Sequence, residues 1–329
     1  MASCYYEWAA RSHQHSAPLA GVVKEYTQHE WDAAVAEDCR EIVRLAVRED
    51  LERLFDWTTL ALVPPGTEGA AAIVVRQPGV VCGLRAAEVA LSEMDAALQL
   101  SDPRIDGDVV EPGTRVGIVK GPARSLLAAE RILLNLMGRL SGVASLTRQY
   151  VEAVAGTSAQ IYDTRKTTPG FRLMEKYAVR CGGGRNHRTG LYDAILIKDN
   201  HLALAAEIEG VGHLTPAEAV RRARDFVDAK ATSQQTAQMI VEVEVDSLDQ
   251  LAEVLPEQPD VVLLDNMSPD MLREAVALRD RLAGQVQLEA SGRVNLETVA
   301  SLAASGVERI SVGALTHSAP ALDVGLDWL

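Results

Sequence analysis

The chain has 329 residues, and 47% of them are hydrophobic. This length is enough for about two domains, and the apolar fraction excludes a disordered chain and a miniature fold held by disulfides. Forty-six acidic residues against 32 basic ones give a formal net charge of −14, which argues against generic binding to nucleic acid or to anionic membranes. An anionic ligand would therefore need a local basic pocket.

The N-terminus and the cysteines indicate a cytoplasmic protein. Residues 1–30 carry polar side chains and histidines where a signal peptide has its apolar centre, so we interpret them as a variable extension. No apolar run reaches the roughly 20 residues of a transmembrane helix, so no membrane association is expected. The four cysteines form no C-x-x-C pair, which predicts reduced thiols rather than a zinc site or disulfides.

Residues 31–142 are predicted to form a small α+β domain. Apolar residues recur at helical spacing from Trp31 to Leu54. Short β-like runs follow between turns that contain proline and glycine, at residues 71–75, 80–82 and 116–120. A long helical stretch then runs from Ala123 to Ala155, with a break expected near Ser141-Gly142.

Residues 143–317 are predicted to form a β/α barrel. Six short apolar runs alternate with amphipathic helical stretches, at residues 160–162, 194–197, 240–245, 261–264, 286–288 and 310–312. Such alternation is typical of parallel strands joined by crossover helices, and polar residues after the runs are typical of a barrel's active face. Because six strands can be counted rather than eight, we expect an incomplete barrel. The polar insertion Asp228–Gln238 is interpreted as a solvated loop.

A basic segment from Asp163 to His201 predicts an anion-binding pocket. It holds eight Lys and Arg but only four acidic residues, and arginine binds carboxylates through two parallel hydrogen bonds. Gly182-Gly183-Gly184 allows the backbone to approach a ligand closely. A solvated surface loop is the alternative interpretation. Lys198 follows an apolar strand, where it is a Schiff-base nucleophile, a fixed cation or a plain strand end.

Carboxylates and glycines follow the later strands. Glu242 and Glu244 share one face of a strand; Glu244 lies nearer the mouth of the barrel, and Glu242 suits a buried ion pair. Together with Asp265, at the end of the next strand, Glu244 could bind sugar hydroxyls or Mg²⁺ through its waters. Ser291-Gly292-Arg293 and Ser311–Ala314 follow the last two strands, where exposed backbone N–H groups predict a phosphate site.

These residues lie in motifs that resemble those of the quinolinate phosphoribosyltransferase family. The resemblance covers roughly residues 35–329. The motifs that carry it are, in chain order, Glu130-Arg131, Leu140-Ser141-Gly142, Asp163-Thr164-Arg165-Lys166-Thr167-Thr168-Pro169-Gly170, Gly182-Gly183-Gly184-Arg185-Asn186-His187-Arg188, Ile197-Lys198-Asp199-Asn200-His201, Val241-Glu242-Val243-Glu244, Leu264-Asp265-Asn266, Ser291-Gly292 and Val312-Gly313-Ala314-Leu315-Thr316-His317.

The resemblance implies a reaction, a fold and an assembly. The family joins quinolinate to 5-phosphoribosyl-1-pyrophosphate (PRPP), releasing pyrophosphate and CO₂ and giving nicotinate mononucleotide for NAD synthesis, with Mg²⁺ as cofactor. Its fold packs an N-terminal α/β sandwich domain on an open, incomplete β/α barrel. In this chain it places the sandwich at residues 31–142, joined by the tail 318–329, and the barrel at residues 143–317. Members are homodimers or larger, with an active site shared between subunits.

The resemblance also implies roles for individual residues. Arg131 is similar to the arginine that crosses from the neighbouring subunit, and Lys166 to the lysine between substrate and PRPP. Glu244 and Asp265 match the acids that serve catalysis, the ribose hydroxyls and the metal. The other matches bind the two quinolinate carboxylates (Arg165, His187, Arg188 and Lys198) and the 5-phosphate (Ser291, Gly292, Gly313 and His317).

Three other functions are left open as alternatives. The first is a phosphoribosyltransferase for a pyridine monocarboxylate such as nicotinate, without decarboxylation; Arg131, Arg165 and Arg188 argue for two carboxylates instead. The second is a Schiff-base aldolase built on Lys198, which leaves the basic motif and the triple glycine unexplained. The third is a non-enzymatic barrel that binds a phosphorylated metabolite and regulates a partner.

Overall fold

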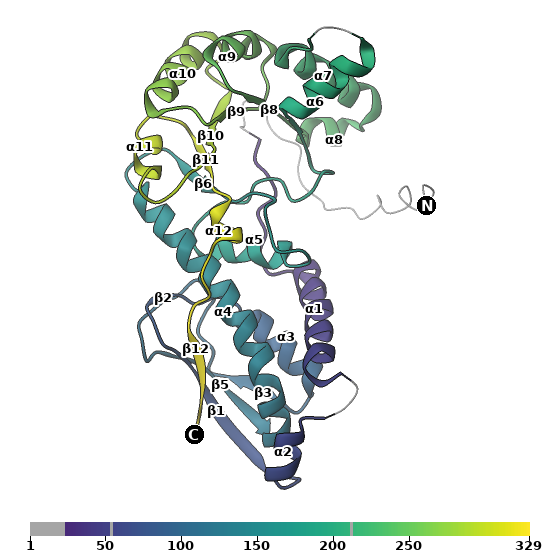
Figure 1. Ribbon diagram of the computed structural model, residues 1–329, viewed down its shortest axis with the longest axis vertical. Helices are drawn as coiled ribbons and strands as arrows, with labels where there is room; N and C mark the ends of the chain where they lie inside the picture. The colour runs from purple at the N-terminus through teal and green to yellow at the C-terminus, as the bar shows by residue number, and fades with distance from the viewer. Residues whose placement is uncertain (1–23, 53–54, 211–212) are drawn as a thin grey trace.

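The computed structural model describes residues 24–52, 55–210 and 213–329, which form two domains joined by one long helix (Figure 1). An antiparallel sheet forms one end of the molecule and a parallel sheet wrapped by helices forms the other. The long helix, α4 (Ala123–Ala153), contributes Leu133 and Met137 to a core within the first domain, and Leu140 and Val143 to a larger core that includes residues of both domains. Within the described residues, no helix is both long enough and apolar enough to cross a membrane.

The first domain combines a four-stranded sheet, in the order β12-β1-β5-β3, with helices α1, α3 and α4. Its elements are α1 (Ala33–Leu51), α2 (Trp57–Leu62), β1 (Glu68–Val75), β2 (Gly79–Val80), α3 (Leu84–Met94), β3 (Gln99–Ser101), β4 (Val109–Val110) and β5 (Arg115–Pro122). Helix α1 begins where the side chain of Asp32 accepts hydrogen bonds from the amides of Ala34 and Val35. Strand β12 (Val324–Trp328) comes from the far end of the chain and pairs with β1, Ala71 opposite Trp328.

The second domain is a six-stranded, wholly parallel sheet in the order β6-β11-β10-β9-β8-β7. Its elements are β6 (Gln160–Tyr162), α5 (Arg172–Cys181), β7 (Ala194–Ile197), α6 (Asp199–Glu209), α7 (Pro216–Lys230), α8 (Ser233–Gln238), β8 (Ile240–Val245), α9 (Leu248–Val254), η1 (Leu255–Glu257), β9 (Val261–Asp265), α10 (Pro269–Leu282), β10 (Gln287–Ser291), α11 (Val299–Ala303), β11 (Arg309–Ser311) and α12 (Ala314–His317). Strands β6 and β7 end the order and do not pair with each other, so the prediction of six strands in an open barrel is confirmed.

The insertion at residues 228–238 is largely solvent-exposed, as expected, but it is helical and not a loop. Residues 228–230 complete α7, and a second short helix, α8, follows. The side chain of Thr232 accepts a hydrogen bond from the amide of Gln235, whose own side chain accepts one from the amide of Thr232. This capping box starts a new helix two residues after the first one ends.

The expected break near Ser141-Gly142 does not occur, because α4 is continuous there. The Ser141 hydroxyl accepts a hydrogen bond from the amide of Cys82 and donates one to its carbonyl oxygen, at 2.9 and 2.8 Å. Gly142 lies against the tail, where an added Cβ would sit 2.0 Å from the carbonyl oxygen of Pro320. Both residues are therefore packing positions on an intact helix.

Gly142→Ala is expected to destabilise the protein by about 1–3 kcal/mol, because neither the helix nor the Pro320 backbone can move away cheaply. This outweighs the higher helix propensity of alanine, which is worth about 1 kcal/mol in the opposite direction. Gly284→Ala is the matched control, since nothing lies within 4 Å of the Cβ that it would add. Thermal unfolding of both variants measures the effect; an unchanged Tm for Gly142→Ala would contradict the packing argument.

Of residues 1–30, interpreted from the sequence as a variable extension, residues 24–30 pack against the barrel, and residues 1–23 lie outside the described part. Lys24 pairs with Asp260 at 3.1 Å and donates to the carbonyl oxygen of Met239, just before strands β9 and β8 begin. Tyr26 is buried with Tyr162 and Ile240. This segment, residues 24–30, therefore packs against the N-terminal ends of the barrel strands.

Candidate active site

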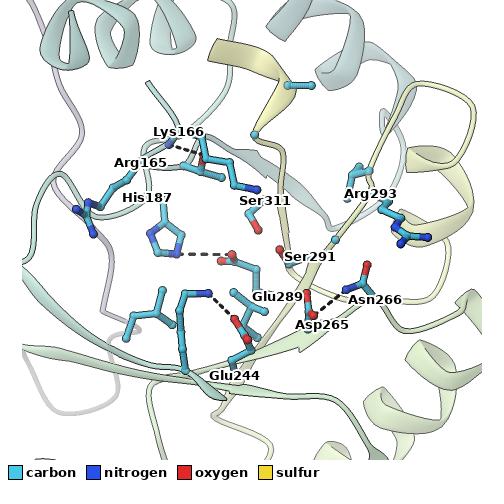
Figure 2. A pocket seen from close by; sticks show the side chains of 18 of the residues that line it. Arg165, Lys166, His187, Glu244, Asp265, Asn266, Glu289, Ser291, Arg293 and Ser311 are labelled. Carbon is cyan, nitrogen blue, oxygen red and sulfur yellow. Dashed lines mark hydrogen bonds and ion pairs between the residues drawn. The ribbon is translucent and has the colours of Figure 1, made fainter. Parts of the chain in front are cut away.

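A cavity of about 850 Å³ opens at the C-terminal ends of the barrel strands. Figure 2 shows basic side chains (Arg165, Lys166) on one side of it and carboxylates (Glu244, Asp265) on the other. Its lining includes eleven of the twelve predicted site residues: Arg165, Lys166, His187, Arg188, Lys198, Glu244, Asp265, Ser291, Gly292, Gly313 and His317. The sequence pattern thus placed residues from six different strand ends in one cavity.

The basic side of the cavity lacks enough counter-charge for its arginines. Arg165 and Arg188 both line it, and the buried Nε of Arg165 has no hydrogen-bond partner among the described residues. Burial, followed by the guanidinium groups of Arg188 and Arg172, lowers the pKa of Arg165. An anion bound here would supply both the missing acceptor and the missing negative charge.

Other basic residues of the segment support the loop and do not line the cavity. Lys176 is wholly buried, pairs with Asp163 at 2.5 Å and donates to the carbonyl oxygen of His187. Arg180 donates to the carbonyl oxygen of Gly184. The positive window of the sequence therefore divides into residues that hold the loop and residues that face the ligand, a division that charge counting cannot make.

The opposite side of the cavity carries Glu244 and Asp265, at the ends of the neighbouring strands β8 and β9. Glu244 forms an ion pair with Lys198, and Asp265 accepts a hydrogen bond of 2.7 Å from the side chain of Asn266. Lys198 therefore already has a carboxylate partner on the neighbouring strand, which favours a binding role over the Schiff-base role of the aldolase alternative. Two carboxylates that face an open cavity are a donor set that fits hydrated Mg²⁺.

Two loops form the third side of the cavity. At Gly292 the φ angle is +93° and an added Cβ would lie 2.3 Å from Oδ1 of Asn266, so only glycine fits. Gly313 packs against Lys166 and His317, where an added Cβ would lie 3.1 and 3.2 Å away. Helix α12 begins directly after Gly313, whereas α11 begins only at Val299 and is separated from Gly292 by further loop residues.

His187 and Glu289 line the floor of the cavity, and Glu242 lies next to them without lining it; all three are buried. Nε2 of His187 lies 3.1 Å from Glu242 and 3.6 Å from Glu289, and its Nδ1 accepts a hydrogen bond from the amide of Arg188. Both ring nitrogens therefore already have partners within the protein. Burial, and next the charge of Glu242, raise the pKa of Glu289 to about 7.

Several cavity residues lie outside the predicted set, among them Asn266 and Glu289, while Arg293 and Ser311 belong to the two loops predicted as a phosphate site. Glu289 could have been predicted from the sequence, because it lies two residues before Ser291 and therefore points to the same face of the strand. Arg131 is the predicted residue that the structure does not bring to the cavity. Its side chain is exposed on α4, and it does not line the cavity of its own chain.

Comparisons with known proteins agree along almost the whole chain. The family model "Quinolinate phosphoribosyl transferase, N-terminal domain" matches residues 56–141, and the model of the C-terminal domain matches residues 143–327. This chain belongs to the quinolinate phosphoribosyltransferase family. Of the family's members, the nicotinate-nucleotide pyrophosphorylase [carboxylating] of Mycobacterium leprae is 43% identical, over 91% of this chain and 98% of its own.

Other members of the family are similar in sequence or in structure. Quinolinate phosphoribosyltransferase [decarboxylating] 2b from Nicotiana tabacum is 38% identical, over 88% of this chain and 82% of its own. The solved structure of the nicotinate-nucleotide pyrophosphorylase from Francisella tularensis has a TM-score of 0.81 and 34% identity, and it covers 93% of this chain and 100% of its own. The open barrel with its added antiparallel domain is thus the fold of the quinolinate phosphoribosyltransferase family.

Proposed function

We propose that this chain transfers the phosphoribosyl group of PRPP to quinolinate with decarboxylation, giving nicotinate mononucleotide, pyrophosphate and CO₂ for NAD synthesis. The observation that carries this proposal is the division of the cavity into an arginine side with an unpaired Nε and a carboxylate side. A pyridine dicarboxylate needs the first, and a ribose that develops positive charge needs the second. The family assignment supports the same reaction.

Arg165 and Arg188 on the basic side, together with Lys198 from beside Glu244, bind the two carboxylates of quinolinate. The guanidinium forks are suited to the planar carboxylates, while Lys198 adds a point charge that its ion pair with Glu244 keeps in place. His187 contributes the surface of its ring to this side of the cavity, because both of its ring nitrogens already have partners within the protein. The pyridine nitrogen then faces the ribose of PRPP. Nicotinate, with one carboxylate, would leave part of this charge unpaired.

On the acidic side, Glu244 and Asp265 stabilise the ribose as its bond to pyrophosphate breaks. The positive charge that develops on the sugar ring is greater in the transition state than in PRPP, so nearby carboxylates lower the barrier. Lys166 stabilises the departing pyrophosphate. Glu244 and Asp265 would hold Mg²⁺ through water, and the ion would neutralise charge on pyrophosphate. Ser291, Gly292, Gly313 and His317 hold the 5-phosphate.

Decarboxylation follows from the first step. Attack by the ring nitrogen on the ribose carbon makes a pyridinium, which accepts the electron pair of the neighbouring C–C bond as the 2-carboxylate leaves as CO₂. A proton then replaces the carboxylate on the ring carbon. This step needs no separate base, because it releases neutral CO₂ and takes up a proton from solvent on the ring carbon.

The proposal includes a homodimer, or a larger assembly, in which Arg131 of one subunit enters the cavity of the other. Its exposed position on α4, away from the cavity of its own chain, supports this. We also place the enzyme in the cytoplasm, since Cys39, Cys82 and Cys181 are free thiols, as is usual in a reducing compartment.

Incubation with PRPP, Mg²⁺ and quinolinate labelled at its 2-carboxylate tests the reaction. We expect labelled CO₂ and nicotinate mononucleotide in equal amounts, and no nucleotide when nicotinate replaces quinolinate. Nucleotide from nicotinate without CO₂ from quinolinate would mean that the enzyme is a monocarboxylate transferase, and the assignment of the arginine side would then be wrong.

A further inference from the structure

Tyr26 lies beneath the floor of the cavity, in the segment 24–30, which the sequence alone indicates only as part of a variable extension. It is 4% exposed and does not line the cavity. Its ring stacks on His187 with centroids 4.4 Å apart and planes inclined by 25°. Its hydroxyl donates to Oε2 of Glu242 at 2.5 Å, and the same oxygen lies 3.1 Å from Nε2 of His187. Tyr26, His187 and Glu242 therefore form a closed triangle of contacts.

This triangle leaves the imidazole of His187 one orientation. Stacking on Tyr26 sets the plane of the ring, and the bond to Glu242 sets its rotation within that plane. The tyrosine remains a donor because burial, and next the charge of Glu242, raise its pKa. Once the ring is fixed, its Nδ1 lies 2.8 Å from the amide of Arg188 and accepts its hydrogen. Through His187, Tyr26 therefore helps to fix the backbone of Arg188, a residue that lines the cavity.

The segment is also tied to the loop on either side of His187. The side chain of Gln28 accepts a hydrogen bond from the amide of Asn186 and donates one to its carbonyl oxygen, at 2.9 and 3.0 Å. Nε2 of His29 lies 2.7 Å from the hydroxyl of Thr189. The segment thus contacts Asn186 and Thr189, the residues directly before and after His187 and Arg188.

We propose that Tyr26 is a positioning residue for quinolinate: through His187 it holds Arg188 in place to bind a substrate carboxylate. This inference rests on the proposed function. It assigns a part in substrate binding to a side chain that touches no substrate, from a stretch of sequence outside both family matches.

Tyr26→Phe tests this, since it removes the hydroxyl and keeps the ring. We expect KM for quinolinate to rise about tenfold, with KM for PRPP unchanged and Tm close to wild type. Tyr162→Phe is the matched control. Tyr162 is equally buried and its hydroxyl donates at 2.6 Å to Glu25 of the same segment, so KM for quinolinate should stay at its wild-type value.

The ¹⁵N resonances of the His187 ring, assigned with a His187→Gln spectrum and recorded without substrate, give a second readout. In Tyr26→Phe we expect them to shift from their wild-type values as the ring loses its fixed orientation. Wild-type resonances together with wild-type KM would overturn the inference and leave Tyr26 as packing alone. An Arg188→Gln variant with normal KM for quinolinate would instead overturn the proposed carboxylate site, whatever the ring resonances show.

Discussion

Arg131→Ala should abolish activity, and mixing it with the equally inactive Lys166→Ala should restore about a quarter of the wild-type rate. The reason is that Lys166 lines the cavity of its own chain while Arg131 does not. A mixed dimer would contain one site with both residues intact and one with neither. Random exchange makes half of the dimers mixed, so about one site in four works. The steady-state rate after subunit exchange is the measurement.

A second mixture provides the control for this experiment. Lys166 and Asp265 both belong to the cavity of one chain, so Lys166→Ala mixed with Asp265→Asn places a defect in every site and should recover nothing. Recovery in both mixtures would show that the regained activity does not come from a site shared between subunits. Failure of the first mixture, once exchange has been shown with labelled subunits, would place Arg131 outside the neighbour's cavity.

Glu244→Gln should lower kcat by about 10²–10³-fold while changing KM for quinolinate little. The substitution removes a negative charge that the transition state needs more than the ground state does. The amide oxygen still accepts a hydrogen bond from Lys198, which preserves the quinolinate side of the cavity. Separate determination of kcat and KM for both substrates distinguishes these effects.

Glu253→Gln, an identical change on the exposed face of α9, is the control and should leave both constants unchanged. A variant of Glu244 that loses quinolinate affinity but turns over normally would contradict the role given to this carboxylate. It would instead make the ion pair with Lys198 part of the quinolinate site.

The barrel and its active face could be predicted because both follow from local patterns. Runs such as Val261–Leu264 are apolar throughout, as strands buried on both faces must be, and the residue after each run must lie at the mouth. Lys198 and Asp265 were found in this way, and Glu244 was found from its position on its strand, nearer the mouth than Glu242. Their distances and pairings were not, because the ion pair between Lys198 and Glu244 joins two strands and leaves no trace in spacing.

What escaped prediction depends on contacts between distant parts of the chain. Ser141 and Gly142 have the composition of a helix break, but the partners that make them fit a helix are Cys82 and Pro320. Tyr26 shows no periodicity with its neighbours, and its partners His187 and Glu242 are far from it in the sequence, Glu242 by 216 residues. Local propensity cannot indicate such residues, since tertiary packing overrides it.

The pairing of β12 with β1 has a consequence for biosynthesis. The sheet of the first domain lacks an edge strand until residues 324–328 have left the ribosome, because these residues form the strand that pairs with β1, Trp328 opposite Ala71. Until then β1 presents an unpaired edge, which is a hazard for association with other nascent chains. The domain translated first is therefore completed last, after the whole barrel has been translated.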